Sequence, residues 1–310
     1  MATTDPTIPA LTGVFPVLPT PFDREGQADE AALRRLVRYL LHCGVDGLTY
    51  PGVASEVGQL TEPERLRLTA AVLHEVAGRV PVIVGASSAD AATTGRLARD
   101  AITLGAAALM VAVPPDRPTA PAQIAYFSEV AAAAPGAALM LQNVPLPVGA
   151  GLEPAAVLEV LAAVPSIRYV KEETLPSGQR LSQVRAQAPA SLLGVFGGAG
   201  GRYITDELRR GAAGTMPAIE LTEVHVALFK VHRAGEADRA RLLFTRMLPV
   251  LNVQAVFRWA LTKHVLVRRG LLACDHQRAA GPRLDELDRA DVDAFLDDLA
   301  DLLPPMETLS

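Results

Sequence analysis

Between Gly13 and Met216 the chain repeats one pattern: a short apolar run, a break of Gly, Pro or polar residues, and a longer segment with apolar residues at helical spacing. Segments such as Glu30–His42 and Glu64–Val76 are predicted as helices, because their apolar residues form one stripe. Eight apolar runs are predicted as strands: Val14–Leu18, Gly47–Tyr50, Val80–Val84, Ala107–Val111, Ala137–Leu141, Ile167–Val170, Leu192–Phe196 and Ala212–Met216.

The predicted strands are apolar at successive positions, as expected for a parallel sheet that helices cover. Eight such units fit an α/β protein of the (β/α)8 TIM barrel type. An open, doubly wound sheet is the alternative. It would usually have a Gly-rich phosphate turn after its first strand, where this chain has Pro16, Pro19 and Pro21. We therefore predict the barrel.

Only helical patterns follow Met216. They predict a last barrel helix and a C-terminal helical extension. The predicted organisation is a barrel core over residues 10–220, with the last barrel helix and the extension over residues 221–310, all in one structural unit. The predicted helices of this region are Thr222–Arg233, Ala237–Leu248, Val253–Arg269 and Leu284–Leu303.

Composition and charge exclude several classes of partner. The chain has 310 residues, 50% hydrophobic and 20% charged, which is enough to bury a large core. Its net charge of −5 provides no basic field for nucleic acid or an anionic membrane. No apolar run of about 18 residues occurs, and the first ten residues do not read as a signal peptide. We therefore predict a cytoplasmic protein with no membrane or nucleic-acid partner.

Nothing in the sequence indicates a metal or another cofactor. Cys43 and Cys274 lie far apart, without the spacing of a metal site or a disulfide framework, and both are predicted to be reduced. None of the six histidines ends a predicted strand. His74-Glu75 does not continue into the second histidine of a zinc helix motif, so we predict no metal ion and no cofactor.

Lysine gives the clearest candidate for chemistry. The chain contains Lys171, Lys230 and Lys263, and Lys171 directly follows the predicted strand Ile167–Val170. Barrel enzymes carry their catalytic residues at such strand ends. The low dielectric there disfavours an ammonium group and makes the neutral amine available as a nucleophile for a Schiff base. Lys230 and Lys263 lie in predicted amphipathic helices, where solvated or snorkelling side chains are expected.

A structural role for Lys171 is the alternative, as an ion pair with Glu172 or Glu173 at the barrel rim. Position alone does not choose between this role and catalysis.

Five ordered motifs stand out along the chain: Gly13–Phe22, Gly44–Leu48, Gly52–Glu56, Gln142–Pro145 and Val170–Glu172. They resemble those of the dihydrodipicolinate synthase/N-acetylneuraminate lyase family. The similarity extends from about Gly13 to the predicted helix at Val253–Leu271. The resemblance implies a (β/α)8 barrel, a class I lyase that acts on a small 2-oxo acid, a homo-oligomer (tetramer or dimer), and a Schiff-base lysine that corresponds to Lys171.

The chain departs from the synthase and sialic-acid lyase pattern at three places. Members of those groups carry Tyr-Asn-Val-Pro where this chain has Gln142-Asn-Val-Pro, and an amide cannot titrate. The usual Gly-Thr-Thr-Gly-Glu loop is Gly52-Val-Ala-Ser-Glu56, so the hydroxyl that couples to that tyrosine is missing. The segment Leu146–Gly149 lacks the arginine that the synthases use for aspartate semialdehyde. Dihydrodipicolinate synthesis is therefore disfavoured.

Gln142 together with Lys171-Glu-Glu-Thr174 is more similar to the family's 2-keto-3-deoxy sugar acid dehydratases, in particular the L-2-keto-3-deoxyarabonate type. The leading hypothesis is therefore a Schiff-base lyase that dehydrates a 2-keto-3-deoxy sugar acid. A pyruvate-releasing aldolase or a dihydrodipicolinate synthase-like enzyme is the alternative within the enzymes. A non-catalytic 2-oxo acid binding protein is the alternative from another class.

The proposed proton transfers need a further group beside Lys171. Candidates are a water held by Gln142, the hydroxyl of Ser55 or of Thr174, and the carboxylate of Glu173, which is the titratable one. A solvated rim carboxylate is the alternative interpretation of Glu173.

The resemblance implies that the loop Gly52–Glu56 binds the substrate carboxylate through backbone N–H groups of Gly52, Val53, Ala54 and Ser55. A plain turn requirement is the alternative interpretation of Gly52. The resemblance adds the backbone of Met216, whose side chain could equally fill the barrel mouth. The Gly197–Gly201 segment lacks the Lys-Ser/Thr of a phosphate loop, and we expect its glycines to permit a close approach of substrate or backbone.

Overall fold

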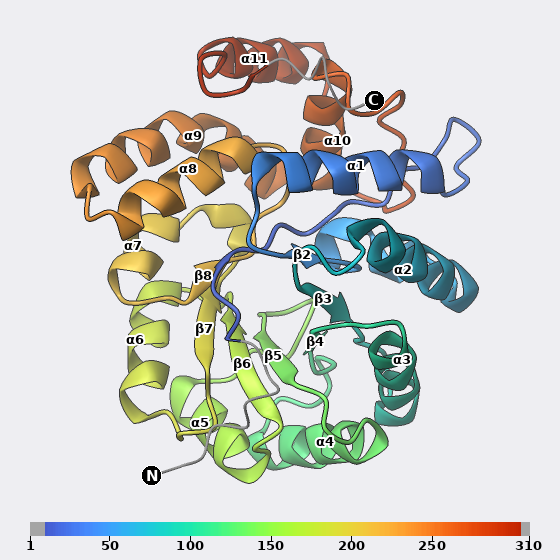
Figure 1. Cartoon of the computed structure of the whole chain (residues 1–310), viewed down its shortest axis with the longest axis vertical. Helices are drawn as coiled ribbons and strands as arrows, with labels where there is room; N and C mark the ends of the chain where they lie inside the picture. Colours follow the sequence, from blue (N-terminus) through green and yellow to red (C-terminus); the bar gives the residue numbers. More distant parts are fainter. Residues whose placement is uncertain (1–9, 305–310) are drawn as a thin grey trace. The chain divides into compact units, whose positions relative to one another are not determined.

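The computed structural model describes residues 10–304. Its strands form one sheet in the order β1-β8-β7-β6-β5-β4-β3-β2 (Figure 1). A parallel bridge between Val17 and Thr49 pairs the chain after the first strand with the second, which brings the two ends of this order together. The predicted (β/α)8 TIM barrel with C-terminal helices is thereby confirmed.

Each predicted apolar run overlaps a strand, although the first, second and last strands are shorter than predicted. The middle strands are buried at nearly every position, as a parallel sheet covered by helices requires. The strands are β1 (Gly13–Val14), β2 (Leu48–Thr49), β3 (Val82–Gly85), β4 (Ala108–Val111), β5 (Leu139–Asn143), β6 (Ile167–Glu172), β7 (Gly194–Gly197) and β8 (Gly214–Thr215).

Helices alternate with these strands and continue after the last one. The helices are α1 (Glu30–Cys43), α2 (Glu62–Val76), α3 (Ala91–Thr103), α4 (Ala120–Ala133), α5 (Pro154–Ala163), α6 (Ser177–Gln187), α7 (Ile204–Arg209), α8 (Thr222–Arg233), α9 (Ala237–Phe257), α10 (Trp259–Arg268) and α11 (Glu286–Asp297). Short 3-10 turns occur at η1 (Val53–Ser55), η2 (Val57–Gln59) and η3 (Ala199–Gly201).

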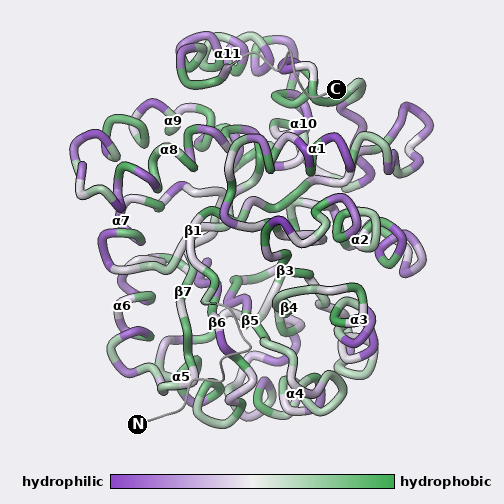
Figure 2. Tube along the Cα trace, viewed as in Figure 1, coloured by the Kyte–Doolittle hydropathy of each residue, from purple (hydrophilic) through white to green (hydrophobic). Residues whose placement is uncertain are grey.

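The described chain divides into two compact parts. The first contains residues 10–13, Pro81–Gly198 and Asp206–Thr215. In it, strands β3 to β7 lie side by side and helices α3 to α6 cover their outer face (Figure 1). Neighbouring helices pack in sequence order, α3 on α4, α4 on α5 and α5 on α6. Hydrophobic colour dominates β5 and β7 in Figure 2, as expected for strands at the centre of a core.

The second part contains Val14–Val80, Ala199–Thr205 and the chain from Met216 onward. Helix α1 packs against α2 and α8, and α9 packs against α8, α10 and α11. Hydrophobic and hydrophilic residues alternate along α8 and α9 in Figure 2, as expected for helices with one apolar and one polar face. The C-terminal extension is therefore a set of packed helices within this part.

Two helix boundaries differ from the prediction. The break expected between Ala237–Leu248 and Val253–Arg269 is wrong, because α9 runs through Pro249 as far as Phe257. Proline removes one backbone hydrogen bond from a helix. Burial of apolar residues on both sides of Pro249, among them Met247 and Val250, outweighs that loss.

The chain breaks instead at Arg258, whose φ of 45° separates α9 from α10. The predicted helix Leu284–Leu303 is also shorter than expected, and α11 covers Glu286–Asp297.

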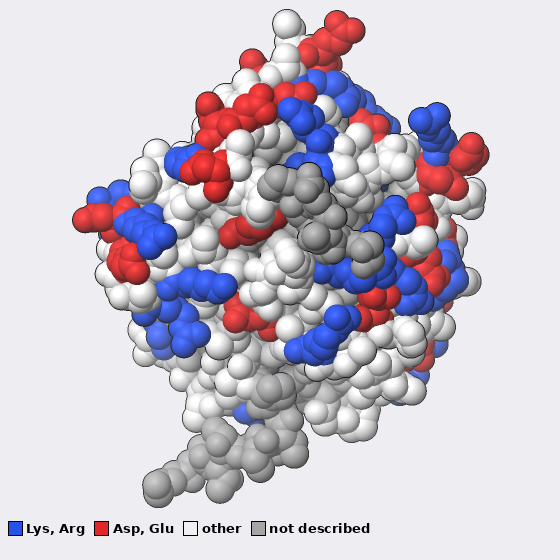
Figure 3. All heavy atoms as spheres, turned by 45° about the horizontal axis from the view of Figure 1, so that its top comes forward, with Lys and Arg blue, Asp and Glu red and all other residues white. Residues whose placement is uncertain are grey.

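The surface carries both signs of charge. On the face that Figure 3 shows, Lys and Arg side chains are interspersed with Asp and Glu side chains. No helix in residues 10–304 is long and apolar enough to cross a membrane.

Candidate active site

The predicted nucleophile and the predicted amide lie opposite each other on neighbouring strands. Strands β5 and β6 pair in parallel, with Gln142 beside Lys171 and Asn143 beside Glu172. Because side chains alternate along a strand, Gln142 and Lys171 share one face of the sheet and their neighbours face the other. These positions are the carboxyl-terminal ends of both strands, where barrel enzymes place their chemistry.

Glu173 joins the other two predicted catalytic residues into one contact. Its Oε1 lies 3.1 Å from Lys171 Nζ, and its Oε2 accepts a 2.6 Å hydrogen bond from Gln142 Nε2. The Lys171 side chain is 6% exposed and that of Glu173 is 13% exposed. The carboxylate of Glu173 is therefore not a solvated rim group, and the ion pair expected as an alternative forms with Glu173 rather than Glu172.

This geometry provides an amine with a proton acceptor at hydrogen-bonding distance. A carboxylate can take a proton from an ammonium group and free the nitrogen lone pair for attack on a carbonyl carbon. The amide of Gln142 cannot titrate, but as a donor it fixes the second oxygen of Glu173.

A glycine makes room for this contact. A Cβ atom on Gly198 would lie 2.5 Å from Glu173 Oε1 and 2.7 Å from Lys171 Cε, closer than van der Waals contact allows. A close approach was expected for the Gly197–Gly201 segment, by substrate or backbone. At Gly198 the groups that approach the backbone are the side chains of Glu173 and Lys171.

A buried polar network lies on the opposite face of the same strand ends. Glu172 accepts 2.8 Å hydrogen bonds from Asn143 Nδ2 and from the Thr174 backbone N–H, and Arg180 Nε lies 3.5 Å from its Oε1. Asn143 also donates to the Leu152 carbonyl and accepts from the Leu152 N–H. Burial raises the pKa of Glu172 to about 7, although these partners oppose the shift.

A second buried carboxyl group, that of Glu207, belongs to this outer face. It accepts a 2.7 Å hydrogen bond from Ser177 Oγ, while its other oxygen has no partner among the described residues. Burial raises its pKa to about 7, and the charges of Glu173 and Asp206 add to the shift. Gly197 is required here because a Cβ would collide with the Glu207 carboxylate.

No role was predicted for Asn143, Arg180 or Glu207. Asn143 belongs to the motif Gln142–Pro145 and Glu172 to the motif Val170–Glu172, and strand alternation places them on the face opposite to Gln142 and Lys171. No sequence signal connects Arg180 or Glu207 to the site, because each reaches it from a helix.

The two candidate hydroxyls are already engaged in the structure. Ser55 Oγ donates to the Leu18 carbonyl at 2.5 Å, and Thr174 Oγ1 donates to the Asn143 carbonyl at 3.3 Å. A hydroxyl that donates to a backbone carbonyl must leave that bond before it can donate to a substrate. Glu173 differs from both hydroxyls because it is a carboxylate in direct contact with Lys171.

The predicted carboxylate-binding loop lies in the second part of the molecule, where residues Val53–Ser55 form the turn η1. The Gly52 N–H donates to Ser55 Oγ at 2.8 Å, and the Ser55 N–H donates to the Gly52 carbonyl at 3.0 Å. Within residues 10–304 the N–H groups of Val53 and Ala54 have no acceptor. The loop therefore presents two unpaired backbone donors.

Met216 also lies in the second part, directly after β8, and its side chain is buried. Lys171, Gln142 and Glu173 are thus in contact within the first part, and the loop Gly52–Ser55 and Met216 belong to the second.

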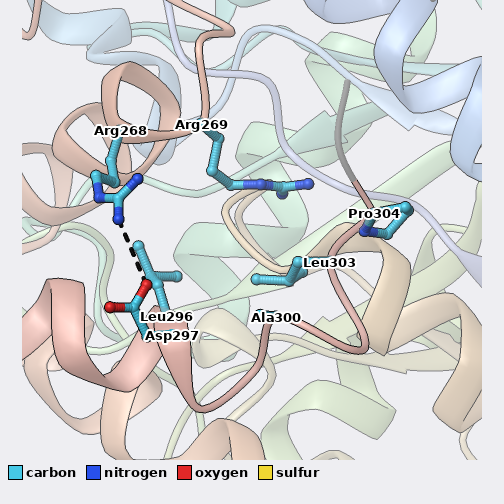
Figure 4. A pocket seen from close by; sticks show the side chains of 7 residues that line it. All are labelled: Arg268, Arg269, Leu296, Asp297, Ala300, Leu303 and Pro304. Atoms are coloured by element: carbon cyan, nitrogen blue, oxygen red, sulfur yellow. Dashed lines mark hydrogen bonds and ion pairs between the residues drawn. The ribbon is translucent and has the colours of Figure 1, made fainter. Parts of the chain in front are cut away.

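Two other features of the described chain bear on function. No group of three or more His, Cys, Asp or Glu residues in it could hold a metal ion. A pocket in the second part has Arg268 ion-paired with Asp297 at 3.4 Å (Figure 4). It contains no lysine, cysteine or serine nucleophile, so it is not a candidate for the catalytic centre. Its lining residues are Arg268, Arg269, Leu296, Asp297, Ala300, Leu303 and Pro304.

A (β/α)8 barrel that carries a lysine at the end of its sixth strand, beside a carboxylate, has the arrangement expected of a lyase of the class I aldolase type. The comparisons with known proteins specify the family. The chain belongs to the dihydrodipicolinate synthetase family, whose sequence profile matches residues 10–297. The resemblance found in the sequence is confirmed.

Curated relatives carry two different activities in their names. An L-2-keto-3-deoxyarabonate dehydratase from Azospirillum brasilense is 29% identical over 294 residues, covering 93% of this chain and 94% of the relative. A 4-hydroxy-tetrahydrodipicolinate synthase from Thermus thermophilus is 34% identical over 283 residues, covering 89% and 92%.

Solved structures agree on the fold. Dihydrodipicolinate synthase from Rhodopseudomonas palustris has a TM-score of 0.88 at 30% identity and covers 94% of this chain and 98% of its own. A prophage protein of the same family from E. coli K12, in complex with pyruvate, has a TM-score of 0.84 at 26% identity and covers 93% and 98%.

Proposed function

We propose that this enzyme dehydrates a 2-keto-3-deoxy sugar acid through a Schiff base on Lys171, without a metal or cofactor. The observation that carries the proposal is the contact of Lys171, Glu173 and Gln142 on one face of β5 and β6. The resemblance to a relative named L-2-keto-3-deoxyarabonate dehydratase supports the dehydration.

The first step joins the substrate to Lys171. Glu173 Oε1, 3.1 Å from Nζ, takes a proton from the ammonium group, and the freed lone pair attacks the C2 carbonyl carbon. Loss of the carbonyl oxygen as water leaves a protonated imine. That imine withdraws electrons from C3 and makes a C3 proton acidic.

The second step eliminates the hydroxyl group. A carboxylate at Glu173 removes the C3 proton, which gives an enamine, and the enamine expels the hydroxyl on C4. The proton held by Glu173 leaves with that hydroxyl as water. Hydrolysis of the unsaturated imine then frees Lys171, so the net reaction is the loss of one water molecule. Gln142 holds the Glu173 carboxylate in position throughout.

Substrate binding is assigned to the loop Gly52–Ser55 and to Met216. The unpaired N–H groups of Val53 and Ala54 are suited to a carboxylate, which every 2-oxo acid carries. The proposal includes a homo-oligomer, a dimer or tetramer, as the family resemblance implies.

The same geometry makes dihydrodipicolinate synthesis the weaker candidate. Gln142 cannot relay a proton as a tyrosine can, and Leu146–Gly149 has no arginine for a second substrate. Retro-aldol release of pyruvate needs the same imine, and a 2-oxo acid binding protein needs only the groups that bind the acid. The products distinguish these three possibilities.

Borohydride trapping tests the proposal. The protein is incubated with pyruvate and with a panel of 2-keto-3-deoxy acids, reduced, and analysed by intact mass and peptide mapping. We expect an adduct on Lys171 whose mass is one water lower than that of the intact substrate adduct. A pyruvate-sized adduct from a longer substrate would indicate retro-aldol cleavage instead.

Replacement of the nucleophile completes the test. We expect Lys171→Ala to abolish both the adduct and turnover, and turnover retained in this variant would refute the Schiff-base mechanism. Saturable binding of a 2-oxo acid to the wild-type protein without turnover would favour the binding protein.

A further inference from the structure

Lys263 is not the solvated or snorkelling side chain that its helix pattern predicted. It is fully buried in α10, and its Nζ lies 2.5 Å from Glu56 Oε1. The ammonium group also donates to the His276 carbonyl at 2.7 Å and lies 4.3 Å from the centre of the Phe22 ring. The prediction was wrong because the helix is covered by residues distant in sequence, which a helical pattern alone does not reveal.

The partner of Lys263 is the last residue of the predicted carboxylate-binding motif. Glu56 follows η1 with a left-handed φ of 55° and is itself buried. Its second oxygen accepts a 2.6 Å hydrogen bond from the Ala279 N–H. A buried ion pair contributes little net stability compared with packed apolar side chains, but it fixes its two ends in one geometry. The Lys263–Glu56 pair therefore fixes one end of the loop.

A second contact from α10 reaches the other end of the turn. Trp259 Nε1 donates a 2.9 Å hydrogen bond to the Val53 carbonyl. That carbonyl belongs to the same planar peptide unit as the Ala54 N–H, and the two groups of a trans peptide point in opposite directions. A bond that fixes the Val53 carbonyl therefore also fixes the direction of the unpaired Ala54 N–H.

We propose that α10 of the C-terminal extension positions the loop Val53–Glu56 for the substrate carboxylate, with Trp259 and Lys263 as positioning residues. This inference rests on the proposed function, in which the N–H groups of Val53 and Ala54 bind that carboxylate. Neither side chain takes part in the chemistry at Lys171. Their loss therefore weakens the binding of a 2-oxo acid and leaves the reaction of the bound acid unchanged.

Trp259→Phe tests the first contact, because it removes the indole N–H and keeps an aromatic ring. The probe is pyruvate, and the measurement is borohydride labelling of Lys171 over a range of pyruvate concentrations. We expect the half-saturating concentration to rise about fivefold, the size typical of one lost hydrogen bond. The maximal labelling at saturation should stay at the wild-type level.

Thr262→Val is the matched control. Thr262 lies on the same helix and donates a 3.1 Å hydrogen bond to buried Glu220, which is not part of the loop. This variant also loses one buried hydrogen bond, so we expect a lower unfolding temperature without a change in the half-saturating concentration. An equal rise in both variants would show a general effect of destabilising α10 and would overturn the proposal.

A double variant is needed to test the Lys263–Glu56 ion pair, because Lys263→Met alone would leave the Glu56 carboxylate buried and without its countercharge. Lys263→Met combined with Glu56→Gln removes both charges and keeps an acceptor for the Ala279 N–H. We expect this folded double variant to raise the half-saturating concentration as Trp259→Phe does. Unchanged values in both variants would refute positioning by α10.

The wild-type protein separates this inference from the proposed function. If pyruvate and the 2-keto-3-deoxy acids label no lysine in the wild type, the Schiff-base function fails and the positioning role fails with it. If the wild type is labelled and the variants saturate as it does, the positioning role alone fails.

Discussion

Glu220 provides a test of how burial controls the stability of this fold. It lies between β8 and α8 and is fully buried. Thr262 Oγ1 donates a 3.1 Å hydrogen bond to its Oε2, while its Oε1 has no partner among the described residues. Burial raises the pKa of Glu220 from 4.5 to about 7. The folded protein therefore holds a proton on Glu220 at pH values where the unfolded chain has lost it.

The sign of the pH dependence follows from this difference. Between pH 4.5 and about 7 the folded state binds more protons at Glu220 than the unfolded state, so the free energy of unfolding falls as the pH rises. Below pH 4.5 both states are protonated, and the group contributes no pH dependence. A shift of this size corresponds to a loss of about 3 kcal/mol above pH 7.

Glu220→Gln removes the titration and keeps an oxygen that can accept from Thr262. The amide leaves unpaired N–H donors, which cost about 1 to 3 kcal/mol at any pH. We therefore compare the free energy of unfolding of the variant with that of the wild type at each pH. We expect this difference, variant minus wild type, to be about 3 kcal/mol more favourable to the variant at pH 8 than at pH 4.5. Urea unfolding followed by circular dichroism at both pH values measures this change.

A matched control separates burial from the chemical change itself. Glu159→Gln makes the same substitution at an exposed position of α5. We expect its free energy of unfolding to differ from that of the wild type by the same amount at both pH values. If the difference for Glu220→Gln is also the same at both pH values, Glu220 is ionised in the folded protein, and the burial argument fails.

Three further predictions concern the site itself. Glu173→Gln should lower kcat by roughly 10²- to 10⁴-fold, because the amide cannot exchange a proton. A pyruvate adduct on Lys171 should still form, but slowly. A kcat equal to that of the wild type would exclude Glu173 as the acid–base group. Gly198→Ala should abolish borohydride labelling of Lys171, because the added Cβ clashes with Glu173. Gly58→Ala is the control, since its Cβ would meet nothing within 4 Å, and Lys171 should be labelled normally in it. Normal labelling in both variants would refute the steric argument. Gln142→Tyr alone should not produce dihydrodipicolinate synthesis in a coupled assay. Appearance of that activity would show that neither the hydroxyl missing from the loop Gly52–Glu56 nor the arginine missing from Leu146–Gly149 is required for it.

The barrel was predictable, and Lys171 could be singled out as the candidate nucleophile, because each depends on local pattern. Apolar runs such as Ile167–Val170 identify strands without any tertiary information, and a parallel sheet fixes which strand ends meet. Lys171 then follows from its position directly after a strand. The pairing of Gln142 with Lys171 was not predictable from the pattern alone, since it depends on the register between β5 and β6.

The parts that the sequence did not reveal depend on long-range packing. Pro249 continues a helix because its neighbours are buried against α8, α10 and α11, which outweighs a local breaker. Lys263 is buried because Glu56, more than 200 positions earlier, supplies its countercharge. Glu207 reaches the outer face of the site from a short helix, with no motif to mark it.

The replacement of a tyrosine by Gln142 determines where the proton must move in the proposed reaction. An amide can hold a carboxylate but cannot accept or release a proton at neutral pH. Because Gln142 Nε2 donates to one oxygen of Glu173 and Lys171 Nζ contacts the other, the carboxylate is fixed at the nitrogen that forms the imine. A base held beside the imine lies close to C3, the carbon that must lose a proton in a dehydration. In the proposed reaction, the substitution that removes the tyrosine relay therefore favours elimination with Glu173 as the acid–base group.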